Sequence, residues 1–225
     1  MFAPMLSRRV AFAACAAMLS AVPGTPKSLL IDFSAPAAAA DWQPVDDRVM
    51  GGTSASRVVS TGGATAFEGQ LVVEGGGFAS ARYLKQLSLA SDVEVLALDV
   101  ASDGRMGYKL TLQSAAAPDG VSYQYTLPPL ESGGSGYTSV RMPLREFKPS
   151  YRGRPAPEAP PLRAPDVRGV GLGLSRYESG GGTAKASIPA GEFRLTLRAL
   201  RVAESDLAIN SRRWVSPPAR PSDRE

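Results

Sequence analysis

The sequence contains no histidine, and its single cysteine, Cys15, lies near the N-terminus. Without histidine the chain has no imidazole to act as an acid or base near neutral pH, so Ser-His-Asp and Cys-His catalytic arrangements are excluded. One cysteine cannot form an intramolecular disulfide or a zinc site. Any catalysis must therefore depend on carboxylates, lysine, tyrosine or a bound cofactor.

The central part of the chain is not basic, although the formal net charge of the whole chain is +4. Residues 1–27 carry three basic and no acidic side chains, and residues 211–225 carry a net charge of +2. The remaining residues therefore hold one net negative charge. A nearly neutral body does not offer the basic footprint that phosphate backbones require, so we expect no nucleic acid partner.

The first 27 residues are rich in alanine, contain Arg8 and Arg9, and include no acid. Their apolar stretch is shorter than the roughly 20 residues that cross a bilayer. This composition predicts a targeting segment, either an organellar transit peptide or a secretory or twin-arginine signal. At the other end, residues 206–225 form a basic, proline-rich tail that we expect to be disordered. Residues 28–205 are then expected to form a single domain.

From Ser28 onward the apolar residues recur mostly with a period of two, which is typical of strands with one buried face. The predicted strands are Leu29 to Phe33, Ala66 to Glu74, Phe78 to Tyr83, Val93 to Val100, Tyr108 to Gln113, Val121 to Leu127, Thr138 to Met142, Val167 to Leu174 and Phe193 to Val202. The alternation shifts phase at Ala199-Leu200, which indicates a bulge or a sheet edge. No segment in this region supports a long helix.

Short strands separated by Gly, Ser and Pro clusters predict an all-β fold, an antiparallel β-sandwich of the jelly-roll kind. The run Gly169-Val170-Gly171-Leu172-Gly173 has a spacing like that of a dinucleotide-binding loop. It lies within a strand pattern, however, and no helix follows it. We therefore interpret these glycines as sites of close approach by a neighbouring segment.

The most distinctive segment is Asp46-Asp47-Arg48-Val49-Met50-Gly51-Gly52-Thr53-Ser54, with Trp42 before it and Gly76-Gly77-Phe78-Ala79-Ser80 after it. Charges and paired glycines are costly to order within one short loop, which suggests a purpose beyond spacing. An Asp-Arg pair would close such a loop by charge-assisted hydrogen bonds, and Arg82, Arg105 and Arg152 are further candidates to meet Asp46, Asp47 or Asp103. Trp42 and Phe78 are more typical of core lids than of ligand-stacking platforms.

These segments, with Phe67-Glu68-Gly69, Asp103-Gly104-Arg105 and Phe147-Lys148-Pro149, resemble the complex I intermediate-associated protein family in order and spacing. The resemblance covers roughly Leu29 to Val202. It implies a galactose-binding-like sandwich and a non-catalytic assembly factor for an organellar membrane complex, foremost mitochondrial respiratory complex I. It also implies that the partners are subunits or assembly intermediates, that no cofactor or metal is required, and that peripheral membrane association is compatible with the role. The mitochondrion is the preferred compartment, with a chloroplast thylakoid complex or bacterial export as alternatives.

The candidate partner surface consists of the residues that carry this motif and the arginines near it. They are Asp46, Asp47, Arg48, Met50, Gly51, Gly52, Ser54, Phe78, Ser80, Arg82, Arg105 and Arg152. The alternative interpretation is that these charges only fix loops to each other. Two other functional classes stay open at this point: a carbohydrate- or ligand-binding module, and an enzyme that uses the two adjacent carboxylates. The enzyme is the least favoured, because adjacent residues of an extended chain point to opposite faces.

Overall fold

The computed structural model describes residues 28–132, 136–176 and 188–205, and their regular structure consists of strands and short 3-10 helices. The strands are β1 (Leu29–Asp32), β2 (Trp42–Pro44), β3 (Ala55–Ser60), β4 (Thr65–Leu71), β5 (Phe78–Tyr83), β6 (Val95–Ser102), β7 (Tyr108–Ser114), β8 (Val121–Thr126), β9 (Thr138–Pro143), β10 (Lys148–Tyr151), β11 (Arg154–Pro155), β12 (Val167–Ser175) and β13 (Gly191–Ala203). The 3-10 helices are η1 (Ala38–Asp41), η2 (Asp47–Met50), η3 (Leu144–Glu146) and η4 (Ala164–Asp166). The all-β expectation is confirmed.

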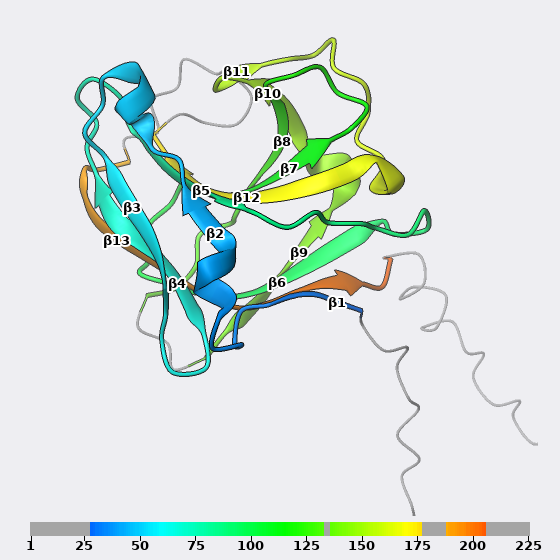
Figure 1. Cartoon of the computed structure of the whole chain (residues 1–225), viewed down its shortest axis with the longest axis horizontal. Helices are drawn as coiled ribbons and strands as arrows, with labels where there is room; N and C mark the ends of the chain where they lie inside the picture. Colours follow the sequence, from blue (N-terminus) through cyan, green and yellow to red (C-terminus); the bar gives the residue numbers. More distant parts are fainter. Residues whose placement is uncertain (1–27, 133–135, 177–187, 206–225) are drawn as a thin grey trace, which may run out of the picture.

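The strands form two antiparallel sheets that pack face to face as a sandwich (Figure 1). The six-stranded sheet has the order β3-β4-β13-β6-β9, and β1 also pairs with β13. The seven-stranded sheet has the order β11-β10-β8-β7-β12-β5-β2. Because sequence neighbours such as β4 and β5 lie in different sheets, the chain repeatedly crosses from one layer to the other. The loops that make these crossings gather at the ends of the sandwich.

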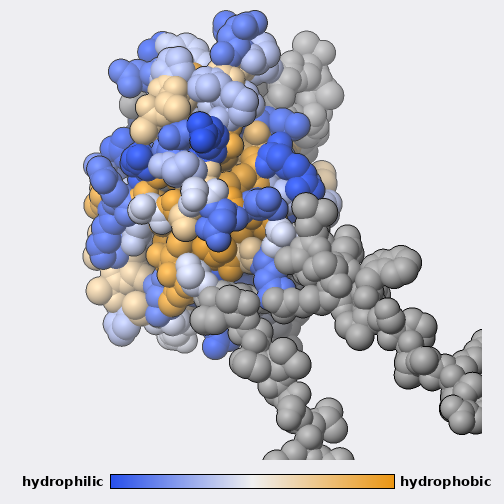
Figure 2. All heavy atoms as spheres, turned by 90° about the vertical axis from the view of Figure 1, so that its right-hand side faces the viewer, coloured by the Kyte–Doolittle hydropathy of each residue, from blue (hydrophilic) through white to orange (hydrophobic). Residues whose placement is uncertain are grey.

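The core lies between the two sheets and is built by alternate residues of each strand. Leu195 and Leu197 of β13 belong to the same buried cluster as Leu110 and Leu172 of the other sheet's central strands, and all four are at most 1% exposed. Burying one such leucine side chain contributes about 1.5–3 kcal/mol, before the loss of conformational entropy is counted. Figure 2 looks at the side that lies on the right in Figure 1 and shows apolar residues between polar margins there.

Trp42 belongs to this core, as expected for a core lid. Its side chain is 6% exposed, and its ring centroid lies 5.6 Å from that of Phe33 and 5.1 Å from that of Tyr83. The indole N–H has no hydrogen-bond partner among the described residues, so the contribution of Trp42 is apolar packing. A ring held in this way is not available to stack on a sugar.

Each strand expected from the sequence is present, with ends displaced by no more than a few residues. The predicted phase shift is a register shift between Leu197 and Ala199 where β13 pairs with β6. Gly169 to Gly173 lie within β12, which confirms that they do not form a phosphate-binding loop. The sequence pattern missed β2, β10 and β11, which are short or contain proline. It also missed β3, a six-residue strand.

The expected targeting segment, residues 1–27, and the expected disordered tail, residues 206–225, lie outside the described residues. Their boundaries with the domain stay a prediction. Within the described part of the chain, no helix is both long and apolar enough to span a membrane. That part also contains no group of three or more Cys, Asp or Glu side chains arranged to hold a metal ion.

Candidate functional site

The carboxylate of Asp47 joins two loops that are distant in sequence. Asp47 opens η2, directly after β2, and its side chain is 0% exposed. Its oxygens accept hydrogen bonds from the backbone N–H of Ser54 at 3.0 Å, the hydroxyl of Ser54 at 2.8 Å and the backbone N–H of Gly77 at 2.8 Å. The Ser54 hydroxyl also receives the backbone N–H of Val72 at 3.0 Å. One buried anion therefore connects the β2–β3 loop with the β4–β5 loop.

The paired glycines of the motif fit around this carboxylate. A Cβ atom on Gly52 or on Gly76 would lie closer than 3.0 Å to the Asp47 carboxyl group, nearer than real Cβ atoms approach. Gly51 ends η2 with a φ of 85°, a left-handed conformation that glycine adopts without strain. Gly52 and Gly76 are thus explained by the anion that they enclose. We call Asp47, Gly52, Ser54, Gly76 and Gly77 the Asp47 cluster.

Hydrogen bonds keep Asp47 ionised in spite of its burial. Burial alone raises the pKa of a carboxyl group, but the hydrogen bonds from Gly77, Ser54 and Phe78 outweigh it, and the pKa of Asp47 falls below its ordinary value of 3.8. A general acid near neutral pH needs a shift in the opposite direction. The arrangement therefore serves to hold the loops together and does not favour proton transfer.

Asp46 makes a separate connection on the other side of the chain. It accepts the backbone N–H of Ser56 at 2.8 Å, the Ser56 hydroxyl at 2.6 Å and the backbone N–H of Ser80 at 3.1 Å. The Ser80 hydroxyl in turn donates to the carbonyl of Val45. Asp46 thereby ties the end of β2 to β3 and β5, and the two adjacent carboxylates do not share one site.

The expectation that an Asp-Arg pair closes this loop is wrong for both Asp46 and Asp47. In the part of the chain that the structure describes, the partners of Asp46 and Asp47 are serines and backbone N–H groups, and no ion pair joins them to Arg48, Arg82 or Arg152. Backbone donors can approach a buried carboxylate without bringing a second charge out of water, which favours this solution over an arginine.

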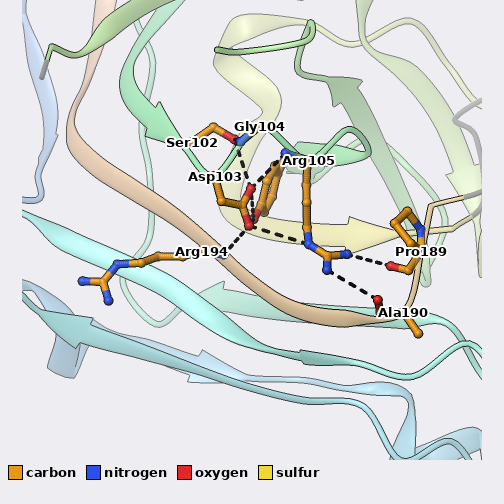
Figure 3. A network of polar contacts seen from close by, with 8 residues as sticks. Ser102, Asp103, Gly104, Arg105, Pro189, Ala190 and Arg194 are labelled. Carbon is orange, nitrogen blue, oxygen red and sulfur yellow. Dashed lines mark hydrogen bonds and ion pairs between the residues drawn. The ribbon is translucent and has the colours of Figure 1, made fainter. Parts of the chain in front are cut away.

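Arg105 does meet a carboxylate, that of Asp103 (Figure 3). The Arg105 Nε lies 3.7 Å from Asp103 Oδ2, and the guanidinium donates to the carbonyl of Pro189 at 2.6 Å and, more weakly, to that of Ala190. Asp103 also accepts the backbone N–H of Arg105 at 3.0 Å and that of Arg194 at 2.8 Å. These contacts fasten the β6–β7 loop to the first residues of β13.

Tyr108 completes the Asp103 network by donating its hydroxyl at 3.1 Å. Burial, and then the charge of Asp103, raise the pKa of Tyr108, so the phenol stays protonated and remains a donor. The network lies at the same end of the sandwich as the Asp47 cluster, because Gly191, next to Ala190, pairs with Leu71 directly before the β4–β5 loop. Two carboxylates thus secure the crossing loops at this end.

The other candidate residues are distributed over the surface. Arg48 and Gly51 are exposed beside the Asp47 cluster, and the side chain of Met50 lies outside the described residues. Arg152 is exposed at the opposite end of the seven-stranded sheet, in the β10–β11 turn, with a φ of 50°. Its guanidinium lies over the ring of Tyr151, 5.2 Å from the centroid. The structure therefore brings the motif loops together but leaves Arg105 and Arg152 in separate environments.

Phe78, Ser80 and Arg82 face outward from the seven-stranded sheet, so the expectation of a core position is wrong for Phe78. Their neighbours Ala79 and Ala81 point into the core, and strand side chains alternate. The same alternation along β12 points Val170, Leu172 and Leu174 into the core and Gly169, Gly171 and Gly173 to the opposite side, where Gly169 and Gly171 are buried beside neighbouring side chains and Gly173 is half-buried. We call Gly169, Gly171 and Gly173 the glycine strip.

The rest of this outer face is polar and carries no acid at the outward positions of its described strands. Beside the glycine strip stand the outward residues of β2, β7, β8 and β10, which are Gln43, Lys109, Thr111, Gln113, Ser122, Gln124, Thr126, Lys148 and Ser150. Lys109 is buried, and its amino group lies 3.5 Å from Gln124 Oε1, whereas Arg82 and Lys148 are exposed. The pattern Val170-Leu172-Leu174 could have identified this face from the sequence.

The outer face of the six-stranded sheet is different, because two of its acids, Glu68 and Asp99, are paired with arginines of neighbouring strands. Glu68 of β4 lies 2.6 Å from Arg57 of β3 and 2.9 Å from Arg194 of β13. Asp99 of β6 pairs with Arg201 of β13. That face therefore carries charges of both signs, several of them paired, whereas the charged residues at outward strand positions of the seven-stranded sheet are all basic.

Comparison with known proteins gives one family and one fold. Residues 31–197 match the model of the complex I intermediate-associated protein 30 family. An uncharacterised protein of Schizosaccharomyces pombe is 26% identical over 188 residues, which cover 76% of this chain and 81% of that protein.

Solved structures of similar architecture include family 11 carbohydrate-binding modules of Clostridium thermocellum. The module of a cellulosomal cellulase gives a TM-score of 0.52 at 13% identity, over 80% of this chain and 96% of that one. A module bound to a mixed-linked tetrasaccharide gives 0.50 at 13% identity, over 79% and 95%. At such identities the likeness establishes the galactose-binding-like sandwich fold alone.

Proposed function

Because the chain belongs to the complex I intermediate-associated protein 30 family, we propose that it binds subunits or assembly intermediates of respiratory complex I and promotes their assembly without catalysing a reaction. The observation that carries this proposal is the extent of the family match. It begins in β1 and ends within β13, so it includes the Asp47 cluster, the Asp103 network and both sheets.

The geometry of the motif loops is consistent with a binding role. The two carboxylates that an enzyme of this kind would use are taken up separately by serine hydroxyls and backbone N–H groups. The exposed members of the candidate surface, Arg48, Gly51, Arg82 and Arg152, are in contrast accessible to another polypeptide. In this proposal, the buried members Asp47, Gly52 and Ser54 support the surface and do not contact the partner.

We propose that the protein acts in an organelle. The mitochondrion is preferred, because the family is named after complex I of the mitochondrial respiratory chain. The leader composition is compatible with this address and also with a plastid or an exported protein. A plastid location would make a thylakoid complex the client. A carbohydrate-binding role receives less support, because Trp42 is buried and the likeness to carbohydrate-binding modules concerns the fold.

The proposal is tested by expressing the tagged full-length chain in its own cells and locating it by fractionation. Native gel electrophoresis, with immunoblots for the tag and for complex I subunits, then gives its size class. We expect the tag in mitochondria, in bands that also contain complex I subunits but are smaller than the complete complex. A tag that migrates only as the free protein, or with thylakoid complexes, contradicts the proposal.

A further inference from the structure

The outer face of the six-stranded sheet carries a small apolar cluster that is separate from the core. Val95 and Ala97 of β6 and Ala203 of β13 are at most 7% exposed, and the residues that alternate with them point into the core. Farther along the same two strands the outward positions are charged, with Asp99 paired to Arg201. We call Val95, Ala97 and Ala203 the outer cluster. Apolar burial on a sheet face that is otherwise polar indicates that another segment covers it.

The immediate neighbours of Val95 on this face are small. Val95 lies opposite Ala203 on one side and opposite Pro143 of β9 on the other, and Ala97 is the next outward residue along β6. Val95 is nevertheless 0% exposed. Complete burial of a valine among alanine and proline requires longer side chains above it.

Arg141 supplies part of this cover and fixes the place where the chain leaves the sheet. It stands on β9 opposite Ala97, and its guanidinium donates to the carbonyl of Glu204, just beyond the end of β13, at 2.6 Å. The side chain of Arg141 therefore crosses β6 beside the outer cluster. The chain continues from Ser205 at the same place.

The sequence that follows β13 contains apolar residues suited to complete the cover. Leu207 and Ile209 come directly after Ser205 and Asp206, two positions apart, and polar residues follow from Asn210. In an extended segment this spacing places both side chains on one face. The segment therefore has an apolar face at the point where the sheet has an apolar cluster.

The distances allow the two faces to meet. Neighbouring strands are about 4.8 Å apart, and an extended chain advances about 3.3 Å per residue, so Leu207 and Ile209 can lie about 7 and 13 Å from Ser205. This reach includes β6 on one side of β13 and β1 on the other. On β1, Leu29 stands opposite Arg201 and is 52% exposed (Figure 1).

We propose that Leu207 and Ile209 fold back onto the outer cluster and Leu29 and form a second, small core on the outer face of the six-stranded sheet. This inference goes beyond the proposed function and does not depend on it. A second copy of the chain or a client would cover the cluster only while bound, and would leave Leu207 and Ile209 in water. The tail that we expect to be disordered then begins near Asn210.

The first test is thermal unfolding of the full-length protein with aspartate at three consecutive positions. Leu207→Asp and Ile209→Asp should each lower the unfolding midpoint by about 2–4 °C, because each brings a charge against apolar side chains. Ala208→Asp is the matched control: it makes the same charge change, but its side chain points away in an extended segment, so the midpoint should move by less than about 1 °C.

Leu207→Ala and Ile209→Ala add no charge and should lower the midpoint by about 1–3 °C, so they decide the matter if an aspartate variant does not fold. Midpoints that equal the wild-type value in all the Leu207 and Ile209 variants overturn the inference. So does a loss for Ala208→Asp as large as that for its two neighbours.

The second test measures access to the outer cluster. Ala97→Cys in a Cys15→Ser background places the one thiol of the chain in the cluster, where we expect slow reaction with a maleimide. Adding Leu207→Ala and Ile209→Ala should accelerate labelling at position 97 at least about tenfold. The control is Ser139→Cys, at an exposed outward position of β9 on the same face, which should react quickly with or without those two substitutions.

Labelling at position 97 that is fast from the outset, or equally slow with and without the two substitutions, contradicts the proposed cover. Slow labelling that becomes fast on dilution of the unsubstituted protein would assign the face to a second copy of the chain and overturn the inference. Neither test involves complex I subunits, so its failure leaves the proposed function unchanged.

Discussion

The Asp47 cluster and the outer face of the seven-stranded sheet lie close together along β5, yet they use polar groups in opposite ways. In the cluster, the carboxylate is 0% exposed and its hydrogen bonds come from within the fold. On the sheet face, Arg82 and Lys148 are exposed and form no ion pair. Where polar groups are buried and satisfied they contribute to stability, and where they are exposed they are available for binding. The motif that attracts attention in the sequence belongs mostly to the first class.

The largest effect that follows from this comparison is expected for Asp47→Asn. The variant keeps the volume but replaces one acceptor oxygen by an N–H₂ group, which then meets either the Ser54 N–H or both the Gly77 N–H and the Ser54 hydroxyl. Leaving such buried donors unsatisfied costs about 1–3 kcal/mol each, so the free energy of unfolding should fall by about 2–5 kcal/mol. Chemical denaturation monitored by tryptophan fluorescence measures it.

Asp32→Asn is the control, because exposed Asp32 accepts similar hydrogen bonds from Ser34 at 2.9 and 2.6 Å but in solvent. It should cost at most about 1 kcal/mol. Since the pKa of Asp47 is lowered by folding, its contribution is complete above the unfolded value and is lost as pH falls through the folded one. Wild type should therefore lose more stability than Asp47→Asn as the pH drops below about 4. Equal acid sensitivity would show that Asp47 is not the anion responsible.

The second prediction compares two glycines, one in each region. Gly52→Ala places a methyl group against the Asp47 carboxylate and should destabilise the fold by about 1–3 kcal/mol. Gly173→Ala meets nothing nearer than 3.8 Å and, because glycine is unfavourable within strands, should be neutral or stabilise by up to about 1 kcal/mol. Thermal unfolding of the two variants side by side distinguishes them. A larger loss for Gly173→Ala than for Gly52→Ala contradicts the assignment of these glycines.

A third, smaller effect is expected at the Asp103 network, which is intermediate between the two regions. The Asp103 side chain is 25% exposed, so water can replace part of what Asp103→Asn removes from Tyr108 and the backbone N–H of Arg194. We expect a loss of about 1–2 kcal/mol. Amide hydrogen exchange should be accelerated at Arg194 and Arg105, and not at Ser54 or Gly77. Protection that is lost equally at both sites would mean that the two networks unfold together.

The strands with long alternating runs could be predicted from the sequence, because the period of two is a local property. In β13, Phe193, Leu195 and Leu197 alternate with polar residues, and even the bulge after Leu197 leaves a visible change of phase. β2 and β11 are too short to show a period, and β10 contains Pro149. Such strands are defined by the neighbours they pair with, and this information is not local.

The candidate site was only partly predictable, for a related reason. The sequence shows that Asp46 and Asp47 are unusual, but their partners are backbone N–H groups of Gly77 and Ser80, which every residue except proline possesses. The sequence therefore pointed to arginines as partners of Asp46 and Asp47, and this prediction was wrong. The outward glycines of β12 could have been found from the buried residues between them, whereas the position of Lys148 on the same face depends on the order of the strands.

The smallest effect on stability is expected for Arg82→Ala, which tests the exposed side of the comparison directly. Arg82 is exposed and makes one hydrogen bond at 3.4 Å, so its removal should change the free energy of unfolding by less than about 0.5 kcal/mol. Chemical denaturation of this variant beside wild type measures the change. If Arg82→Ala instead lowers stability as much as Asp47→Asn, Arg82 supports the fold and the two regions do not differ in kind.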